Sequence, residues 1–304
     1  MNRTVRGIFC TLAGGTFWGF SGACGQYLFT NYHINSSWLT VVRMLGAGIV
    51  LTIFSFLCQR EKPTGIWRRK GDVAQLILFA LFGLMFSQYS YLNSIFYSNA
   101  GTATVLQYLG PVLIMALVCA WNRKFPSVRE TSAIVLAVLG TFLLATHGNP
   151  RTMALSRNGL IWGLLSAVSL ACYTLLPSKI IPKWGSMVVT GFGMLIGGVV
   201  LACLIQVWRI PVTLDAKGWL AVGGVVLMGT IFAYTLYLQG VADVGAVRAS
   251  MLASVEPVSA TLFSVLWLHT AFQLIDLAGF VCIITTVFLL ARKEQKQTLE
   301  IERE

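Results

Sequence analysis

The sequence predicts an all-α integral membrane protein with ten transmembrane helices, arranged as two inverted five-helix repeats. Three observations lead to this prediction: a strongly apolar composition, evenly spaced apolar segments, and a sequence match between the two halves of the chain. Of the 304 residues, 56% are hydrophobic and 11% are charged. Soluble domains carry roughly 25% charged residues, so this composition indicates a polytopic membrane protein.

Ten apolar segments follow one another along the chain, each close to the roughly 20 residues that a helix needs to cross a bilayer. They cover residues 7–29, 37–58, 73–96, 99–121, 128–147, 159–180, 186–208, 218–240, 244–267 and 273–291. The first segment has no small-residue cleavage site after a short apolar core, so we expect a retained span rather than a signal peptide. The connections are too short to hold a soluble domain.

The basic residues predict how the chain is oriented. With the N-terminus placed in the cytoplasm, sixteen Lys and Arg residues flank the cytoplasmic ends of the segments and four flank the outer ends. Positive residues favour the cytoplasmic side, so we expect a multi-pass protein of the cell (inner) membrane with both termini in the cytoplasm. The net charge of +11 is spread over these flanks rather than over one soluble face, so we expect no nucleic-acid partner.

The second half of the chain repeats the first. A shift of 146 residues places 83–145 on 229–291 without a gap, and 15 of these 63 positions are identical, including Pro111 with Pro257. Five segments per half is an odd number, so the second repeat enters the membrane in the opposite direction, an arrangement typical of secondary transporters with a central substrate site. The predicted divisions are a first repeat at 1–147, an outer linker at 148–158, a second repeat at 159–291 and a cytoplasmic tail at 292–304.

The two matched prolines, Pro111 and Pro257, predict kinks in the middle of apolar segments. Pro257 has no N–H, so the carbonyl of Ala253 loses its helical partner, and in a membrane such a carbonyl lines a cavity or finds another donor. Kinked helices at equivalent places in two repeats indicate a binding site. Glu256 stands beside the kink in one half only, since its counterpart is Gly110. Its carboxylate can bind a cationic group or exchange a proton, or it can simply cap the freed backbone.

Arg43 is a second charge inside a segment, and the matching stretch around Thr190 is uncharged. It lies roughly 10 Å, about two helical turns, from the predicted outer edge of the membrane. Three roles stay open for its guanidinium. It can reach outward to the interface, neutralise a buried acid, or bind a substrate carboxylate.

Polar and aromatic side chains gather in several segments, most densely in the third, fourth, eighth and ninth. Such a stripe costs free energy in a bilayer unless it faces a bundle interior or water, which indicates a cavity; hydrogen bonds between helices and aromatic packing are the alternative. The residues that we expect to line the cavity are Trp18, Ser21, Gln88, Tyr91, Gln107, Tyr108, Tyr173, Tyr234, Tyr237 and Glu256. The histidines are scattered at outer ends, so we expect no metal site, and nothing indicates a cofactor.

Three short motifs and one residue carry a resemblance to a known family. They are "GGTFWG" in the first segment, Arg43 in the second, "YLGPVL" in the fourth and "ASVEPV" in the ninth. With the five-plus-five duplication, they make the chain resemble the drug/metabolite transporter superfamily, specifically its ten-helix EamA-type members. The resemblance implies an electrochemically driven carrier for small organic molecules, commonly an exporter, with a central cavity. The family often ends its fourth and ninth spans with a glycine–glutamate pair. Here those places read "WNRKF" and "WLHTA", so no role of that acid is carried over.

Taken together, these features predict a secondary active transporter that works by alternating access. The resemblance further implies that it moves amino acids or related small metabolites, by export. The candidate coupling ion is a proton or another cation, and a monomer is a plausible state. An importer of a sugar or other metabolite is one alternative, and a non-transporting scaffold or sensor is another. The chain has no HExxH, GxSxG or phosphate-cradling motif, so we do not expect an enzyme.

Overall fold

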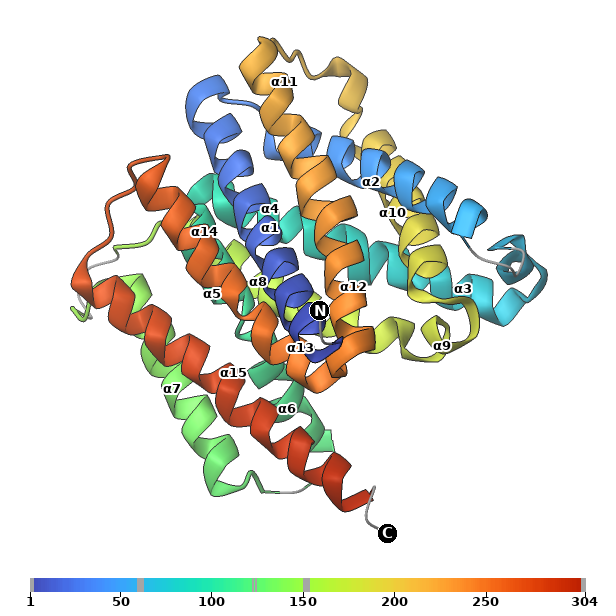
Figure 1. Ribbon diagram of the computed structural model, residues 1–304. Helices are drawn as coiled ribbons and strands as arrows, with labels where there is room; N and C mark the ends of the chain where they lie inside the picture. The colour runs from blue at the N-terminus through green and yellow to red at the C-terminus, as the bar shows by residue number, and fades with distance from the viewer. Residues whose placement is uncertain (1–2, 59–62, 122, 124, 150–153, 302–304) are drawn as a thin grey trace.

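The computed structural model describes residues 3–58, 63–121, 123, 125–149 and 154–301, which leaves out parts of the predicted linker and tail. Within these residues the chain forms helices joined by short connections, without strands (Figure 1). By length and composition, seven helices of the described chain can cross a membrane: Ser36–Leu57, Lys70–Tyr97, Ala100–Leu117, Val128–Thr146, Arg157–Lys179, Ser186–Ile205 and Ala216–Val244. The predicted class, an all-helical multi-pass membrane protein, is confirmed.

The described helices fall into a first and a second half of the chain. The first half contains α1 (Arg3–Tyr32), α2 (Ser36–Cys58), η1 (Pro63–Arg68), α3 (Lys70–Leu78), η2 (Phe79–Met85), α4 (Phe86–Tyr97), α5 (Ala100–Gln107), α6 (Gly110–Trp121) and α7 (Val128–Thr146). The second half contains α8 (Arg157–Leu175), η3 (Leu176–Lys179), α9 (Ile181–Trp184), α10 (Ser186–Ile205), η4 (Val207–Arg209), α11 (Ala216–Gly223), η5 (Gly224–Phe232), α12 (Ala233–Val244), α13 (Ala246–Ala253), α14 (Val255–Leu266) and α15 (Leu274–Ile301).

Each of the ten apolar segments lies on helical structure, but three of them are not among the seven long apolar helices. The helix of segment 7–29, α1, is long, but it carries many glycine and hydroxyl residues that lower its hydropathy. Segment 244–267 is divided by a turn at Ser254, which leaves the shorter apolar helix Val255–Leu266. The apolar part of segment 273–291 is the shorter helix Leu274–Leu289.

Four irregularities interrupt the helices, and they occur in pairs. A π-helical stretch, η2, separates α3 from α4, and η5 separates α11 from α12 in the same way. A turn at 108–109 separates α5 from α6, and a turn at Ser254 separates α13 from α14. Each turn begins three residues before a proline, Pro111 or Pro257, as expected where the ring removes a hydrogen bond from the last turn of a helix.

Helix α1 lies in the middle of the bundle (Figure 1), where it packs against α12, η5 and α14. Around it α2 pairs with α10, α4 with α8, and α7 with α15. Gly15 and Gly19 allow α1 to lie directly against the backbone at the α13–α14 break. A Cβ atom on Gly19 would lie 2.8 Å from the Glu256 carbonyl oxygen, and one on Gly15 would lie 3.1 Å from that of Ala253.

Candidate functional site

The two broken helices meet at the hydroxyl of Tyr108. This residue ends α5, and its oxygen lies 3.0 Å from the carbonyl oxygen of Ala253, the group that Pro257 leaves without a helical partner. The same hydroxyl lies 3.1 Å from Oε2 of Glu256, so it can donate to either acceptor. Glu256 belongs to the first turn of α14 and is half-buried. A carboxylate and a freed backbone carbonyl are therefore held together at one point inside the bundle.

Aromatic side chains form a second part of this region. The ring of Trp18 on α1 lies 5.2 Å, centroid to centroid, from both Tyr234 and Tyr237 on α12. The hydroxyl of Tyr234 lies 3.4 Å from that of Tyr173 on α8. These contacts join three helices that are distant in the sequence, and all four side chains are half-buried. We refer to Trp18, Tyr91, Tyr108, Tyr173, Tyr234 and Tyr237 as the aromatic cluster.

Tyr91 extends the cluster to α4. Its hydroxyl lies 2.9 Å from Oγ1 of Thr104 on α5, and it lies close to Gly22 of α1. The side chain is 6% exposed. Buried tyrosine hydroxyls normally have a hydrogen-bond partner. Here the partner is Thr104, which lies on the same helix, α5, that ends at Tyr108.

Arg43 on α2 is buried, with 7% of its surface exposed, so it does not reach outward to the interface. Within the described residues no carboxylate lies within 4.0 Å of its guanidinium, and its Nε has no hydrogen-bond partner. The ionisable groups that interact with it electrostatically are Tyr91, Tyr234 and Glu256. A buried cation is therefore held near the aromatic cluster without a direct salt bridge.

Three of the predicted lining residues, Ser21, Gln88 and Gln107, make no hydrogen bond to the aromatic cluster within the described residues. Ser21 donates a hydrogen bond to the carbonyl of Val225 at 3.3 Å, which ties α1 to η5. Oε1 of Gln88 is buried without a partner in the described part of the chain. No hydrogen bond among the described residues joins Gln107 to the aromatic cluster, although it is half-buried next to Tyr108.

Comparison with known proteins then identifies the chain. A model of the EamA-like transporter family matches residues 5–146 and again residues 157–292. This protein belongs to the EamA-like transporter family. The predicted membership is thereby confirmed, and with it the general class of a membrane transporter.

Three known proteins are similar to this EamA-like chain. YicL of Salmonella typhimurium (strain LT2), described as an uncharacterized inner membrane transporter, is 35% identical over 98% of this chain and 99% of its own length. YxxF of Bacillus subtilis (strain 168), described as an uncharacterized transporter, is 26% identical over 91% of this chain and 89% of its own length. A solved crystal structure aligns with a TM-score of 0.59 at 19% identity, covering 95% of this chain and 96% of its own, which shows a shared fold.

Sequence reasoning missed a polar network near the C-terminal end of α1 in this EamA-like fold. Oε1 of Gln26 accepts hydrogen bonds from the backbone N–H of Ala100 at 2.8 Å and from Oγ of Ser264 at 3.0 Å. Its Nε2 donates to Oγ1 of Thr270 at 2.8 Å. Gln26 is a polar residue with several hydrogen-bonding groups inside an apolar segment. This position is the sequence signal that could have indicated the network. The network joins α1, α5, α14 and the connection to α15.

At the opposite end of α1, basic residues pair with the end of α12. Both Nε and Nη2 of Arg6 lie 2.8 Å from the carboxylate of Asp243, and Nε of Arg3 lies 3.3 Å from it. Asp243 has a side chain only 2% exposed. A bidentate pair of this kind fixes geometry as well as adding attraction. The two ends of α1 are therefore tied to different neighbours.

Proposed function

We propose that this EamA-like protein is a secondary active transporter that moves a small organic metabolite across the membrane by alternating access. One observation carries the proposal: the breaks of α5–α6 and α13–α14 meet at Tyr108, beside the carboxylate of Glu256. In transporter folds, discontinuous helices from two repeats hold the substrate near the middle of the membrane. Membership of a transporter family supports the general activity.

The proposal includes ten spans in two inverted five-helix repeats. Its support is the position of the irregularities: a shift of 146 residues carries η2 into η5 and the turn at Tyr108 onto the turn at Ser254. The family model also matches each half separately. The pairs α2 with α10 and α7 with α15 are each formed by equivalent helices, as a twofold axis between the repeats requires.

We propose amino acids or related compounds as the substrate class, from the charges around the aromatic cluster. Glu256 offers a carboxylate for an ammonium group, and Arg43 offers a guanidinium for a carboxylate. The two groups are not paired with each other, so both remain available to a zwitterion. The faces of Trp18, Tyr234 and Tyr237 can pack against the substrate's side chain or its cation.

Orientation and coupling complete the proposal. The sixteen-to-four charge bias supports an orientation in the inner membrane with both termini in the cytoplasm. Glu256 exchanges a proton or binds a coupling cation, and the direction is export. An importer would use the same cavity with the opposite coupling, whereas a scaffold would move no solute.

The test is uptake of a panel of amino acids, sugars and nucleotides into liposomes that contain the purified protein, with and without a proton gradient. We expect an amino acid to be moved unmodified, and Glu256→Gln to reduce transport about tenfold to a hundredfold, the effect of losing a hydrogen-bonded charge. Asp276→Asn is the matched control, because Asp276 is a buried acid that pairs with His147 instead. Equal losses in both variants, or no transport of any solute, contradict the proposal.

A further inference from the structure

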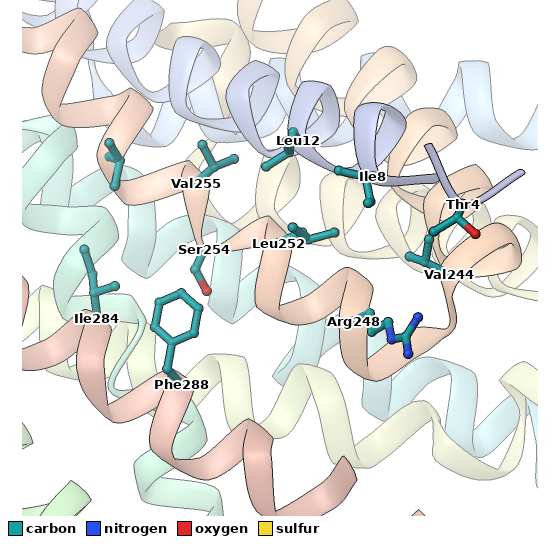
Figure 2. Close-up of a pocket in the computed structure, with 11 residues that line it drawn as sticks. Thr4, Ile8, Leu12, Val244, Arg248, Leu252, Ser254, Val255, Ile284 and Phe288 are labelled. Atoms are coloured by element: carbon teal, nitrogen blue, oxygen red, sulfur yellow. The ribbon is translucent and has the colours of Figure 1, made fainter. Parts of the chain in front are cut away.

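A cleft of about 590 Å³ opens between α1, the α12–α14 segment and α15 (Figure 2). No member of the aromatic cluster lines it. Its walls are apolar, formed by side chains such as Leu12, Leu252 and Phe288. The size lies within the roughly 300–1,000 Å³ of small-molecule pockets. Val258 and Phe288 are 46% and 40% exposed, so the cleft opens on the perimeter of the helix bundle. In a membrane protein this perimeter contacts the lipid chains.

Three polar side chains interrupt the apolar lining, namely Thr4, Arg248 and Ser254, and the last two lie on the α13–α14 segment. Arg248 on α13 is exposed and, among the described residues, makes no ion pair. Ser254 forms the α13–α14 break and is only 3% exposed, and its Oγ has no hydrogen-bond partner in the described chain. Figure 2 shows this oxygen directed into the cleft toward Phe288. A buried hydroxyl without a partner is destabilising, so a ligand that supplies an acceptor there gains a specific contact.

The apolar walls, the single charge and the opening toward lipid together indicate which kind of molecule the cleft binds. Apolar walls disfavour a freely soluble polar metabolite, and the single charge in the lining attracts an anion. Access from the lipid-facing surface favours a molecule that already lies in the bilayer. A glycerophospholipid carries an anionic phosphate, then ester carbonyls that accept hydrogen bonds, then apolar chains.

We propose that the cleft binds one anionic glycerophospholipid of the surrounding bilayer. Its phosphate pairs with Arg248, one acyl chain lies along the apolar walls, and an ester carbonyl accepts a hydrogen bond from Ser254. Arg248 and Ser254 are six residues apart, about 9 Å at the rise of an α-helix. The long, flexible side chain of Arg248 can move its guanidinium to match the distance between the phosphate and the ester carbonyl of the lipid. Because Ser254 lies at the break that presents Glu256, a bound lipid also holds that break in place.

The test is native mass spectrometry of the delipidated full chain, titrated with three lipids. These are diacyl phosphatidylglycerol, its ether-linked dialkyl analogue, which lacks the ester carbonyls, and zwitterionic diacyl phosphatidylcholine. We expect the wild type to prefer diacyl phosphatidylglycerol over both others. Arg248→Gln weakens binding of this lipid about fivefold, the effect of one basic residue on an anionic surface. Ser254→Ala abolishes the preference for the diacyl over the dialkyl form.

Two further variants keep the test independent of folding. Arg248→Lys retains the charge and is expected to keep the preference for the anionic lipid. Arg68→Gln removes an exposed arginine that does not line the cleft and is expected to bind like the wild type. The proposal is overturned if the wild type binds phosphatidylcholine equally well, if the dialkyl lipid binds as tightly as the diacyl lipid, or if Arg248→Gln has no effect. Since binding is the readout, these outcomes do not depend on transport.

Discussion

The hydroxyl of Tyr108 lies within hydrogen-bond distance of both the Glu256 carboxylate and the Ala253 carbonyl. Tyr108→Phe removes the donor to Glu256 and to the carbonyl of Ala253, and Pro257 cannot replace it. A buried carbonyl is then left without a partner, so we expect the free energy of unfolding to fall by about 1–3 kcal/mol. Thermal unfolding of the purified protein in detergent measures this loss.

Tyr237→Phe is the matched control for that variant. Tyr237 is a half-buried member of the same cluster, but in the described part of the chain its hydroxyl makes no hydrogen bond. Its ring contact with Trp18 survives the substitution. A loss of stability as large as that of Tyr108→Phe would show that the hydroxyl contacts at the break are not what matters.

An exposed carboxylate outside the spans gives a pH prediction. Asp215 caps α11, and its pKa lies below the ordinary value because it accepts hydrogen bonds from the Tyr32 hydroxyl and the Gly218 N–H. A lowered folded-state pKa gives stability that is present above the unfolded value, near 3.8, and is lost as the pH falls through the folded value. Asp215→Asn should therefore lower the melting temperature at pH 7, with a difference that narrows in acid. A difference that is constant or grows below pH 4 contradicts this linkage.

At the scale of elements, the contact between α1 and the α13–α14 break depends on the absence of a side chain. A Cβ atom on Gly19 would lie 2.6 Å from the backbone nitrogen of Ala260 and 2.1 Å from Oγ of Ser259. Gly19→Ala forces the two helices apart, and we expect it to cost about 1–3 kcal/mol of stability, as overpacking does. Gly223→Ala on α11 is the control, since nothing lies within 4 Å of the added atom. The melting temperatures of the two variants distinguish packing from a general effect of alanine.

The elements that the sequence predicts best are those with a local chemical cause. Proline removes a backbone donor wherever it stands, so the breaks before Pro111 and Pro257 could be expected from one residue each. The π-helical stretches η2 and η5 have no such marker, because an extra residue in a helix is accommodated by tertiary packing. The partner of the freed Ala253 carbonyl, Tyr108, also could not be predicted, since it lies on another helix.

At the scale of the whole molecule, apolar spacing and the internal match were enough to predict a helical membrane protein of a transporter family. They do not reveal which helices touch. The role of Gln26 could not be predicted for this reason, because its partners Ala100, Ser264 and Thr270 are distant from it in the sequence. The sequence leaves three roles open for Arg43, and the burial of its side chain excludes the outward reach to the interface.

The contacts at the two ends of α1 predict how the whole protein would alternate between states. If transport proceeds as proposed, the Gln26 network closes the outer end and the Arg6–Asp243 pair closes the inner end. Asp243→Asn should then favour opening toward the cytoplasm, and Gln26→Leu should favour opening outward. The measure is labelling of Tyr237→Cys, in a cysteine-free background, by a polar thiol reagent added from one side at a time. Weakening one contact by about 1 kcal/mol shifts the population about fivefold, so labelling should rise by that factor from the matching side only. A rise from the same side in both variants, or in neither, contradicts the assignment of these contacts as opposing gates.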